Sequence, residues 1–531
     1  MALTQTTLNI RGTFCIETIP KPASFIIFGA SGDLTHRKLI PSLFFLYQKA
    51  LLSEHFYIHG CARTQMDDEK FRASFFDKLK ESLGKSSDTK ASGNTVKSFL
   101  NRCFYIAGDY NSENLYINIK NRLVELDKKF QKEKNHIFYL ATPPSLYIPI
   151  VQHLGKSGLS DTPPNAGAFR RPHGERGRTC IIVEKPFGRD LESARKLDSE
   201  LKKVSKEEQI YRIDHYLGKE TVQNILLFRF ANSIFEPIWN RRYIDNIQIT
   251  VAELLGVEHR AGYFEQAGLL RDMFQNHMLQ MLSLVAMEPP ISFDANRVRD
   301  EKVKLLRAIT PIQPHEIRDR VIRAQYGKGT IEGREVPAYR DEKGVAPDST
   351  VETYVAMKLS IDNWRWQGVP FYLRAGKRLA KKSSKIVITF KNVPHSMFQP
   401  LRPEDLEPNI LIFHVQPEEG ISLRILAKRP GPKLCMDTLE MVFRYSDVIE
   451  GELPDAYERL LLDCMLGDQT LFIRNDDMEV SWSLITPIAE VFEDKSKASL
   501  AGTLHIYPAG SWGPVATEEL LQKDGRSWVR I

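Results

Sequence analysis

The chain has 531 residues, of which 42% are hydrophobic and 26% are charged. This length exceeds what one hydrophobic core usually supports, so we expect a globular protein of two or three domains. The formal charge of +6, from 73 basic and 67 acidic residues, is too mild for a nucleic-acid-binding surface but suits small anionic ligands.

The cysteines and the apolar runs favour a cytoplasmic protein. The six cysteines are dispersed, and no two of them have the CxxC spacing of a metal-binding knuckle. No apolar run reaches the roughly 18 residues that cross a membrane. Residues 1–23 also lack the apolar centre of a secretory signal. We therefore expect reduced thiols, a cytoplasmic location and neither a membrane nor a nucleic-acid partner.

Short apolar runs alternate with helical patterns through the first 211 residues. Strands are predicted at 24–28, 56–60, 103–107, 136–141 and 180–184, and helices at 39–47, 67–84, 112–130, 145–154 and 190–204. This alternation predicts a Rossmann-like, doubly wound parallel sheet of the α/β class. The domain is expected to span 1–211, with an N-terminal extension at 1–23 and an inserted surface loop, rich in Gly, Pro and Arg, at 162–178.

Beyond residue 211 the pattern changes to alternating apolar and polar residues, which is typical of antiparallel strands. Strands are predicted at 245–255, 350–361, 385–391, 409–416 and 421–427, and helices at 219–232, 266–287 and 453–467. Residues 212–531 are therefore expected to form an α+β domain with a large, mostly antiparallel sheet. This domain would bind the substrate and carry the oligomer contacts.

The first predicted strand leads into a turn that bears two glycines. Its sequence is Gly29-Ala30-Ser31-Gly32-Asp33-Leu34, and a helical pattern follows. Such a turn holds the pyrophosphate of a dinucleotide against a helix N-terminus, although a purely structural turn is the alternative. The second strand is followed by Arg63, where an NAD site usually has Asp or Glu. Because an arginine fork suits a 2′-phosphate, NADP is favoured over NAD.

Residues 212–220, Arg-Ile-Asp-His-Tyr-Leu-Gly-Lys-Glu, are the run richest in reactive side chains. If a helix begins at Lys219, its N–H groups and dipole favour an anion there. His215, Tyr216 and Lys219 would add donors of three different reaches, as a phosphate needs. The alternative is an ordinary polar loop before a helix.

Two lysines lie where an anionic substrate could be held. Lys185, in Glu-Lys-Pro-Phe-Gly, follows a predicted strand of the parallel sheet, where ligands bind, and the Lys185–Pro186 bond is a candidate cis bond. Lys377 ends another predicted strand and opens a basic cluster that reaches Lys382. A solvated run of charges is the alternative for the later lysines.

A polar group interrupts the apolar helix predicted at 266–287. Asp272 and His277 are five residues apart, so in an α-helix they would lie about 140° apart, on adjoining faces. Asp272, Gln275, Asn276 and His277 together are costly to bury without a polar ligand, although a histidine satisfied within the core is the alternative. Histidine is the natural base for a hydroxyl proton, and Asp214 is a candidate carboxylate to fix the tautomer of His277.

The ordered set of motifs resembles the glucose-6-phosphate dehydrogenase family from about residue 24 to the C-terminal region. These motifs include GASGDL, EKPFG, RIDHYLGKE, RDxxQNHxLQ and RAGK. The resemblance implies an enzyme that oxidises D-glucose 6-phosphate at C1 to 6-phospho-D-glucono-1,5-lactone and reduces NADP⁺ to NADPH. This reaction is the first step of the oxidative pentose phosphate pathway. It also implies a homodimer or homotetramer and no metal.

The resemblance further implies a role for individual residues. The catalytic pair would be His277, the general base, and Asp214. The 6-phosphate would be bound by His215, Tyr216 and Lys219, and the sugar hydroxyls by Glu253 and Asp272. Lys185, near the nicotinamide, and Lys377 would contact the substrate, and Lys382 stands where some members have a nearby arginine. The coenzyme residues would be Gly29, Ala30, Ser31, Gly32, Asp33, Leu34, Arg63 and Lys185.

Two other functions are kept as alternatives. An oxidoreductase of the glucose–fructose type also joins a Rossmann domain to an open sheet and uses a Glu-Lys-Pro lysine. It does not explain RIDHYLGKE together with RDxxQNH. A non-catalytic NADP-binding regulator would be expected to lack the base or the phosphate ligands, and all of them are present here.

Overall fold

The computed structural model describes residues 19–85, 93–160, 178–432, 434–447 and 453–529. The chain divides into two compact units. Unit 1 comprises residues 1–187, 196–215 and 445–472, and unit 2 comprises residues 188–195, 216–444 and 473–531. The return of residues 445–472 to unit 1 was not anticipated from the sequence. The predicted loop at 162–178, apart from Arg178, and residues 1–18 of the predicted extension lie outside the described residues.

Unit 1 is built on a seven-stranded sheet in the order β17-β6-β5-β4-β1-β2-β3. Its strands are β1 (Ser24–Phe28), β2 (Tyr57–Ala62), β3 (Cys103–Ala107), β4 (His136–Leu140), β5 (Thr179–Val183), β6 (Ile210–Ile213) and β17 (Phe472–Ile473). The strand β1 pairs in parallel with both β2 and β4. The chain order therefore reverses at β1, and in such sheets ligands bind beyond the carboxyl ends of the strands at that point.

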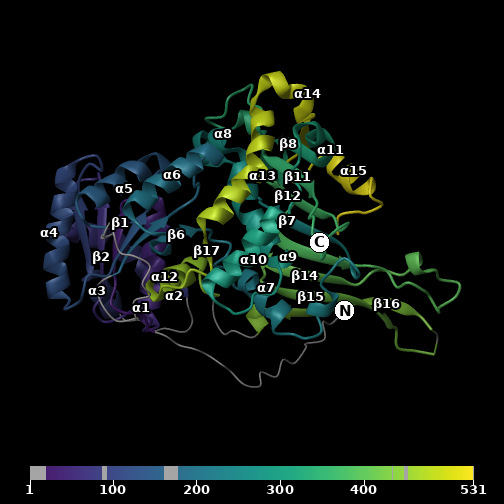
Figure 1. Cartoon of the computed structure of the whole chain (residues 1–531), viewed down its shortest axis with the longest axis horizontal. Coiled ribbons are helices and arrows are strands. Elements are labelled where there is room, and N and C mark those ends of the chain that lie inside the picture. The colour runs from purple at the N-terminus through teal and green to yellow at the C-terminus, as the bar shows by residue number, and fades with distance from the viewer. Residues whose placement is uncertain (1–18, 86–92, 161–177, 433, 448–452, 530–531) are drawn as a thin grey trace. The chain divides into compact units, whose positions relative to one another are not determined.

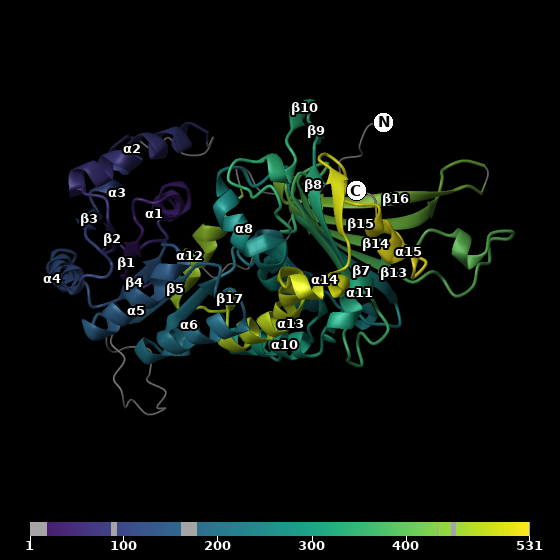
Figure 2. The same ribbon diagram turned by 90° about the horizontal axis from the view of Figure 1, so that it is seen from above.

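Helices cover both faces of this sheet, as Figure 2 shows. On one side lie α4 (Glu113–Lys129), α5 (Tyr147–Lys156) and α6 (Leu191–Val204); on the other lie α1 (Ile40–Gln48), α2 (Asp68–Lys85), α3 (Gly93–Leu100) and α12 (Ala456–Leu466). All five residues of β1 are buried. The predicted Rossmann-like α/β fold is thus confirmed.

Unit 2 contains a nine-stranded sheet in the order β16-β15-β14-β13-β7-β12-β11-β8-β18. Its strands are β7 (Ile244–Ala252), β8 (Val321–Gly327), β11 (Tyr354–Leu359), β12 (Phe371–Gly376), β13 (Ser383–Phe390), β14 (Ile410–Gln416), β15 (Gly420–Lys428), β16 (Met436–Arg444) and β18 (Leu504–Pro508). A separate hairpin is formed by β9 (Gly329–Ile331) and β10 (Arg334–Val336). The large sheet is mostly antiparallel, as predicted, but β7 pairs in parallel with β12 and β8 with β18.

The helices of unit 2 are α7 (Glu220–Phe230), α8 (Ala261–Leu269), α9 (Leu279–Ala286), α10 (Ala295–Arg307), α11 (Ile317–Arg320), α13 (Asn475–Glu493), α14 (Ala498–Ala501) and α15 (Ala516–Gln522). Figure 1 shows α9 and α10 side by side, with α13 running past them. A π-helix, Leu270–Met278, joins α8 to α9. The single helix predicted at 266–287 is therefore three segments.

Two further expectations concern the cysteines and the membrane. The five cysteines in the described part of the chain are free thiols, four of them buried. Among the helices in the described ranges, none combines the length and the apolar character that crossing a bilayer requires.

Candidate active site

The predicted coenzyme turn lies at the carboxyl end of β1. Gly29 has a φ of +90°, and a Cβ atom there would lie 2.3 Å from the carbonyl oxygen of Ala141, so only glycine fits. The carbonyl oxygen of Gly29 accepts hydrogen bonds from the Gly32 N–H at 2.9 Å and from Thr35 Oγ1 at 3.2 Å. These bonds hold the turn against the helical segment that follows it.

The other predicted coenzyme residues surround this turn. Ser31 Oγ lies 3.1 Å from Thr64 Oγ1, which ties the turn to the segment after β2. In that segment Arg63 directly follows β2 and is exposed. Asp33 forms an exposed ion pair with Arg37 at 3.3 Å. Arg63 thus lies one residue before Thr64, whose side chain contacts the turn.

Ala30 and Leu34 complete the turn. Ala30 is fully buried, and its Cβ atom would lie only 2.8 Å from a Cβ atom added at Gly60 of β2. Leu34 is the residue before the short π-helix Thr35–Leu39, which leads into α1. Ala30 therefore packs the turn against β2.

Lys185 follows β5 and is half-buried, and the Lys185–Pro186 bond is cis, as expected from the sequence. The neighbouring Glu184 accepts hydrogen bonds from the hydroxyl groups of Tyr139 and Tyr457. Burial raises the pKa of Glu184, against the opposite effect of these hydrogen bonds. The backbone that carries Lys185 is therefore held to β4 and α12 within unit 1.

Two of the predicted phosphate ligands lie in a hydrogen-bonded cluster of unit 2. Lys219 precedes α7, and its Nζ donates to Oε1 of Gln416 at 2.9 Å. Nε2 of Gln416 lies 3.3 Å from the hydroxyl of Tyr216 and 2.7 Å from Ser384 Oγ, to both of which it donates. Gln416, the last residue of β14, was not singled out from the sequence, because a lone glutamine at a strand end carries no local signal.

The N-terminus of α7 is less open than the sequence suggested. The N–H and the hydroxyl of Thr221 both donate to Oε2 of Glu419, at 2.9 and 3.0 Å. A carboxylate of the chain itself thus binds one of the helix N–H groups that were predicted to favour an external anion.

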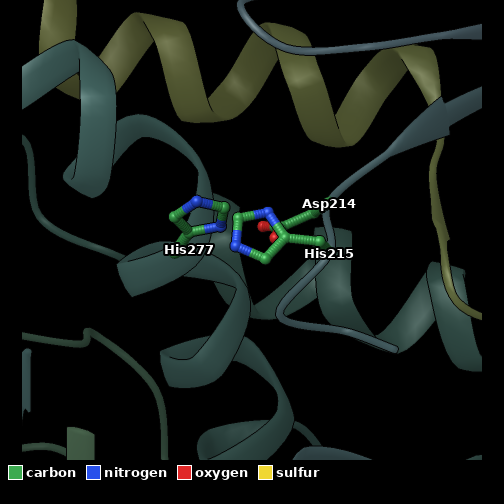
Figure 3. A group of neighbouring side chains, drawn as sticks. All are labelled: Asp214, His215 and His277. Atoms are coloured by element: carbon green, nitrogen blue, oxygen red, sulfur yellow. The ribbon is translucent and has the colours of Figure 1, made fainter. Parts of the chain in front are cut away.

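His277 lies against this cluster. Its ring stacks on the ring of Tyr216, with centroids 4.3 Å apart and an interplanar angle of 27°. Figure 3 shows His277 with Asp214 and His215, whose carboxylate and imidazole ligand atoms lie within 4.8 Å of one another. Asp214 and His277 are each 1% exposed. A buried carboxylate with two imidazoles can serve as an acid–base set, and the same groups can also bind a divalent cation.

The π-helix changes the predicted geometry of Asp272 and His277. An α-helix would place them about 140° apart, and that prediction was wrong, because the whole segment Leu270–Met278 is π-helical. A helix closed by i→i+5 bonds has more residues per turn, so residues five apart come closer to a common face. All nine residues of the segment are buried, and Asp272 Oδ1 accepts a hydrogen bond from the Tyr263 hydroxyl at 3.4 Å.

Lys377 and Glu253, two predicted substrate residues, form an ion pair. The distance between Lys377 Nζ and Glu253 Oε2 is 2.5 Å, and the two residues follow the parallel strands β12 and β7. Lys377 is buried, and its carbonyl oxygen accepts a hydrogen bond from the Tyr507 hydroxyl at 2.5 Å. Lys382 is exposed in the segment between β12 and β13.

Comparison with known families covers nearly the whole chain. The model of "Glucose-6-phosphate dehydrogenase, NAD binding domain" matches residues 26–224, and that of "Glucose-6-phosphate dehydrogenase, C-terminal domain" matches residues 226–529. The glucose-6-phosphate 1-dehydrogenase of Aggregatibacter actinomycetemcomitans is 46% identical over 505 residues, covering 95% of this chain and 97% of the relative. That of Chlamydia pneumoniae is 43% identical over 522 residues, 98% of each chain.

Two solved structures show the same similarity. A glucose-6-phosphate dehydrogenase in complex with its substrate glucose-6-phosphate aligns with a TM-score of 0.85 at 36% identity, over 97% of this chain and all of that one. Glucose-6-phosphate 1-dehydrogenase from Mycobacterium avium aligns with a TM-score of 0.78 at 33% identity, over 97% and 99% of the two chains. From its motifs, its fold and these matches, the chain belongs to the glucose-6-phosphate dehydrogenase family of oxidoreductases, with an NAD(P)-binding domain.

Proposed function

We propose that this chain oxidises D-glucose 6-phosphate at C1 and reduces NADP⁺, forming 6-phospho-D-glucono-1,5-lactone and NADPH. The full-length similarity to named glucose-6-phosphate 1-dehydrogenases supports the reaction. The observation that carries the residue assignment is the stacking of Tyr216 on His277. It joins the segment with phosphate-binding chemistry to a buried histidine that can accept a proton.

The substrate would be held at its two ends by different side chains. His215, Tyr216 and Lys219 offer an imidazole, a hydroxyl and an ammonium to the 6-phosphate. The ion pair of Lys377 with Glu253 offers both a donor and an acceptor to sugar hydroxyls, and Asp272 offers another acceptor. Anchoring the phosphate orients C1 and so lowers the entropic part of the barrier.

His277 would act as the general base. It takes the proton of the C1 hydroxyl while the hydride on C1 leaves for the nicotinamide, and the C1–O bond becomes the lactone carbonyl. NADP⁺ supplies the hydride acceptor. The carboxylate of Asp214 stabilises the imidazolium that forms and fixes the tautomer that can accept a proton. His277 then releases the proton to solvent and becomes a neutral imidazole again.

Arg63 supports NADP⁺ over NAD⁺ as the coenzyme. It follows β2 beside the glycine turn, where an acidic residue would accept the ribose 2′-hydroxyl of NAD⁺. A guanidinium cannot accept that hydrogen bond but can pair with a 2′-phosphate.

The proposal is tested by following NADPH formation with the purified chain. Glucose 6-phosphate with NADP⁺ should be the preferred pair over glucose or NAD⁺. His277→Asn should lower kcat by on the order of 10²- to 10⁴-fold with a modest change in KM, because the base is lost while the phosphate ligands remain. His259→Asn, at an exposed histidine of the same unit, is the matched control.

Other outcomes would point to other functions. Near-wild-type turnover of His277→Asn would remove His277 as the base. A preference for unphosphorylated glucose would favour the glucose–fructose type of enzyme, and nucleotide binding without NADPH formation would favour a regulator. Hydride transfer needs an acceptor and a base but no cation, so a chelator should leave kcat unchanged. If a chelator lowered kcat and a divalent metal restored it, Asp214, His215 and His277 would instead be interpreted as a cation site.

A further inference from the structure

The π-helix that carries Asp272 and His277 begins at a sharp break in the chain. Gly268 has φ +62° and ψ 175°, so it interrupts the helical backbone between α8 and the π-helix Leu270–Met278. An L-residue other than glycine rarely adopts this conformation. The N–H groups that follow the break therefore start a new helix and need partners from elsewhere.

Glu352 supplies both of these partners. Its carbonyl oxygen accepts a hydrogen bond from the Leu269 N–H at 3.2 Å, and its Oε1 accepts one from the Leu270 N–H at 3.0 Å. Glu352 is 7% exposed. A Cβ atom added at Gly268 would lie 2.6 Å from Oε1, so the carboxylate is packed directly against the break. The Glu352 side chain is thus packed against the residue that begins the π-helix.

The charged surroundings of Glu352 are consistent with a buried acceptor. Burial raises the pKa of its carboxyl group, while its hydrogen bonds, Arg271 and Arg323 act in the opposite direction. Arg271 is itself bound to Glu493 at 2.7 Å and to the carbonyl oxygen of Arg189 at 2.8 Å. The first turn of the π-helix is therefore held by two carboxylates from distant parts of unit 2.

The other end of the segment is also fixed. In α9, Gln280 Nε2 donates to Asp477 Oδ1 at 2.8 Å, and Lys302 Nζ lies 3.1 Å from Asp477 Oδ2. Lys302 and Asp477 are at most 1% exposed. The contacts of Asp477 with Gln280 and Lys302 therefore connect α13 to α9 and α10 inside the core. With both ends held, the chain between them cannot relax to the tighter α-helix by shifting either end. A π-helix is rare, and it persists where its surroundings over-determine it.

We propose that Glu352 is a positioning residue for the reaction. By accepting the N–H groups of Leu269, just before the segment, and of Leu270, its first residue, Glu352 keeps Leu270–Met278 in the i→i+5 register and so holds Asp272 and His277 toward a common side. This inference rests on the proposed role of His277 as the base. Without the Glu352 carboxylate, the start of the helix loses the acceptor of the Leu270 N–H, and the segment gains an α-helical alternative in which the two side chains diverge.

The test compares Glu352→Ala with Glu352→Gln in the full chain. Glutamine keeps the volume and an Oε1 acceptor for Leu270, so it should preserve the register, whereas alanine removes the acceptor. We expect Glu352→Ala to lower kcat by on the order of 10²-fold, as a misplaced catalytic group does, with a smaller change in KM for the sugar phosphate. The kcat of Glu352→Gln should stay within about threefold of the wild-type value, because the hydrogen-bond acceptor for Leu270 remains.

Two readouts separate positioning from mere stability. Amide hydrogen exchange of residues 269–278 should be faster in Glu352→Ala and unchanged in Glu352→Gln. The NMR titration of the His277 imidazole should shift in the alanine variant alone. Unchanged exchange and an unchanged titration in Glu352→Ala, even with a lowered melting temperature, would overturn the proposal. Retained turnover in His277→Asn would instead refute the assignment of His277 as the base. The hydrogen-exchange and titration measurements do not depend on that assignment, so the two failures can be told apart.

A second variant serves if Glu352→Ala does not fold. Gly268→Ala would place a Cβ atom 2.6 Å from the Glu352 carboxylate and strain a positive φ, so it should displace the same acceptor. Gly262→Ala, in the same helix α8, meets nothing within 4 Å and is the control. Faster exchange at residues 269–278 in Gly268→Ala but not in Gly262→Ala would support the proposal. Equal exchange in the two would overturn it.

Discussion

The two lysines proposed to bind substrate in unit 2 are held in different ways. Lys219 donates to the neutral amide of Gln416, whereas Lys377 is paired with the carboxylate of Glu253. The amide of Gln416 is neutral, so this hydrogen bond orients the Lys219 ammonium without adding a negative charge beside it. Lys377 keeps its charge partner and is better suited to a neutral hydroxyl. We therefore propose that Lys219 contacts the phosphate end of the sugar phosphate and Lys377 a sugar hydroxyl.

Lys219→Ala should raise KM for glucose 6-phosphate with little effect on kcat. Loss of a charge-assisted hydrogen bond of about 1.5–3 kcal/mol corresponds to a rise of roughly 10- to 100-fold. Initial-rate kinetics with glucose 6-phosphate and with glucose measure this, because glucose has no phosphate and its kinetics should not change. Lys343→Ala, at an exposed lysine of the same unit, is the control. An unchanged KM for glucose 6-phosphate would remove Lys219 from the phosphate site.

At the scale of elements, the glycine turn after β1 shows how a short motif determines local structure. Gly29 has the positive φ and the close backbone contact that the motif predicts, and the turn is closed by bonds to its own carbonyl oxygen. The Cβ atom that any other residue carries there would meet the carbonyl oxygen of Ala141, which belongs to the chain just after β4. The turn is therefore specified by the pairing of β1 with β4 as well as by its own sequence.

Gly29→Ala should destabilise unit 1 and weaken coenzyme binding together. Strain at a positive φ alone costs on the order of 1–3 kcal/mol, and relief of the 2.3 Å contact must move the turn. Chemical denaturation and the KM for NADP⁺ measure the two effects. Gly93→Ala, in α3 of the same unit, meets nothing within 4 Å and should change neither. Wild-type stability of Gly29→Ala would show that the turn can adapt.

Elements with a strong local pattern could be predicted from the sequence, and the rest depended on distant partners. The strand at 24–28 was predicted to the residue as β1, because four consecutive apolar residues follow Ser24 and end at a glycine. The π-helix could not be predicted, because its winding depends on Glu352, 82 residues from Leu270. Gln416 and Glu419 join the α7 segment only through β14 and the turn after it. Sequence periodicity reports a local pattern and carries no information on such pairings.

At the scale of the whole molecule, acid stability reflects a histidine buried in the sheet of unit 1. His59, in β2, is fully buried, and burial lowers its pKa to about 4. In the unfolded chain a histidine titrates near 6.5. Between these two values the unfolded state binds more protons than the folded state. Stability is therefore fully present above about pH 6.5 and is lost as the pH falls toward 4.

His59→Leu should make the free energy of unfolding depend less on pH between pH 7 and pH 5. Leucine keeps an apolar bulk in β2 but cannot be protonated, so the variant should avoid a loss on the order of 2 kcal/mol between pH 7 and pH 5. Urea unfolding at the two pH values measures the difference. His55→Leu, at an exposed histidine of the same unit, should keep the wild-type pH dependence. Equal pH dependence in wild type and His59→Leu would show that other groups set the acid limit.

The return of residues 445–472 to unit 1 has a consequence for synthesis of the chain on the ribosome. The segment brings α12, whose Tyr457 donates to Glu184 beside Lys185, and the strand β17. Unit 1 therefore remains incomplete until 472 of 531 residues have been made, although its first strand is translated near the beginning. In multidomain chains the N-terminal domain usually folds first during synthesis. Here unit 1 cannot complete its fold before residues 445–472 have been made. Until β17 has been made, the edge of the sheet at β6 lacks its neighbouring strand.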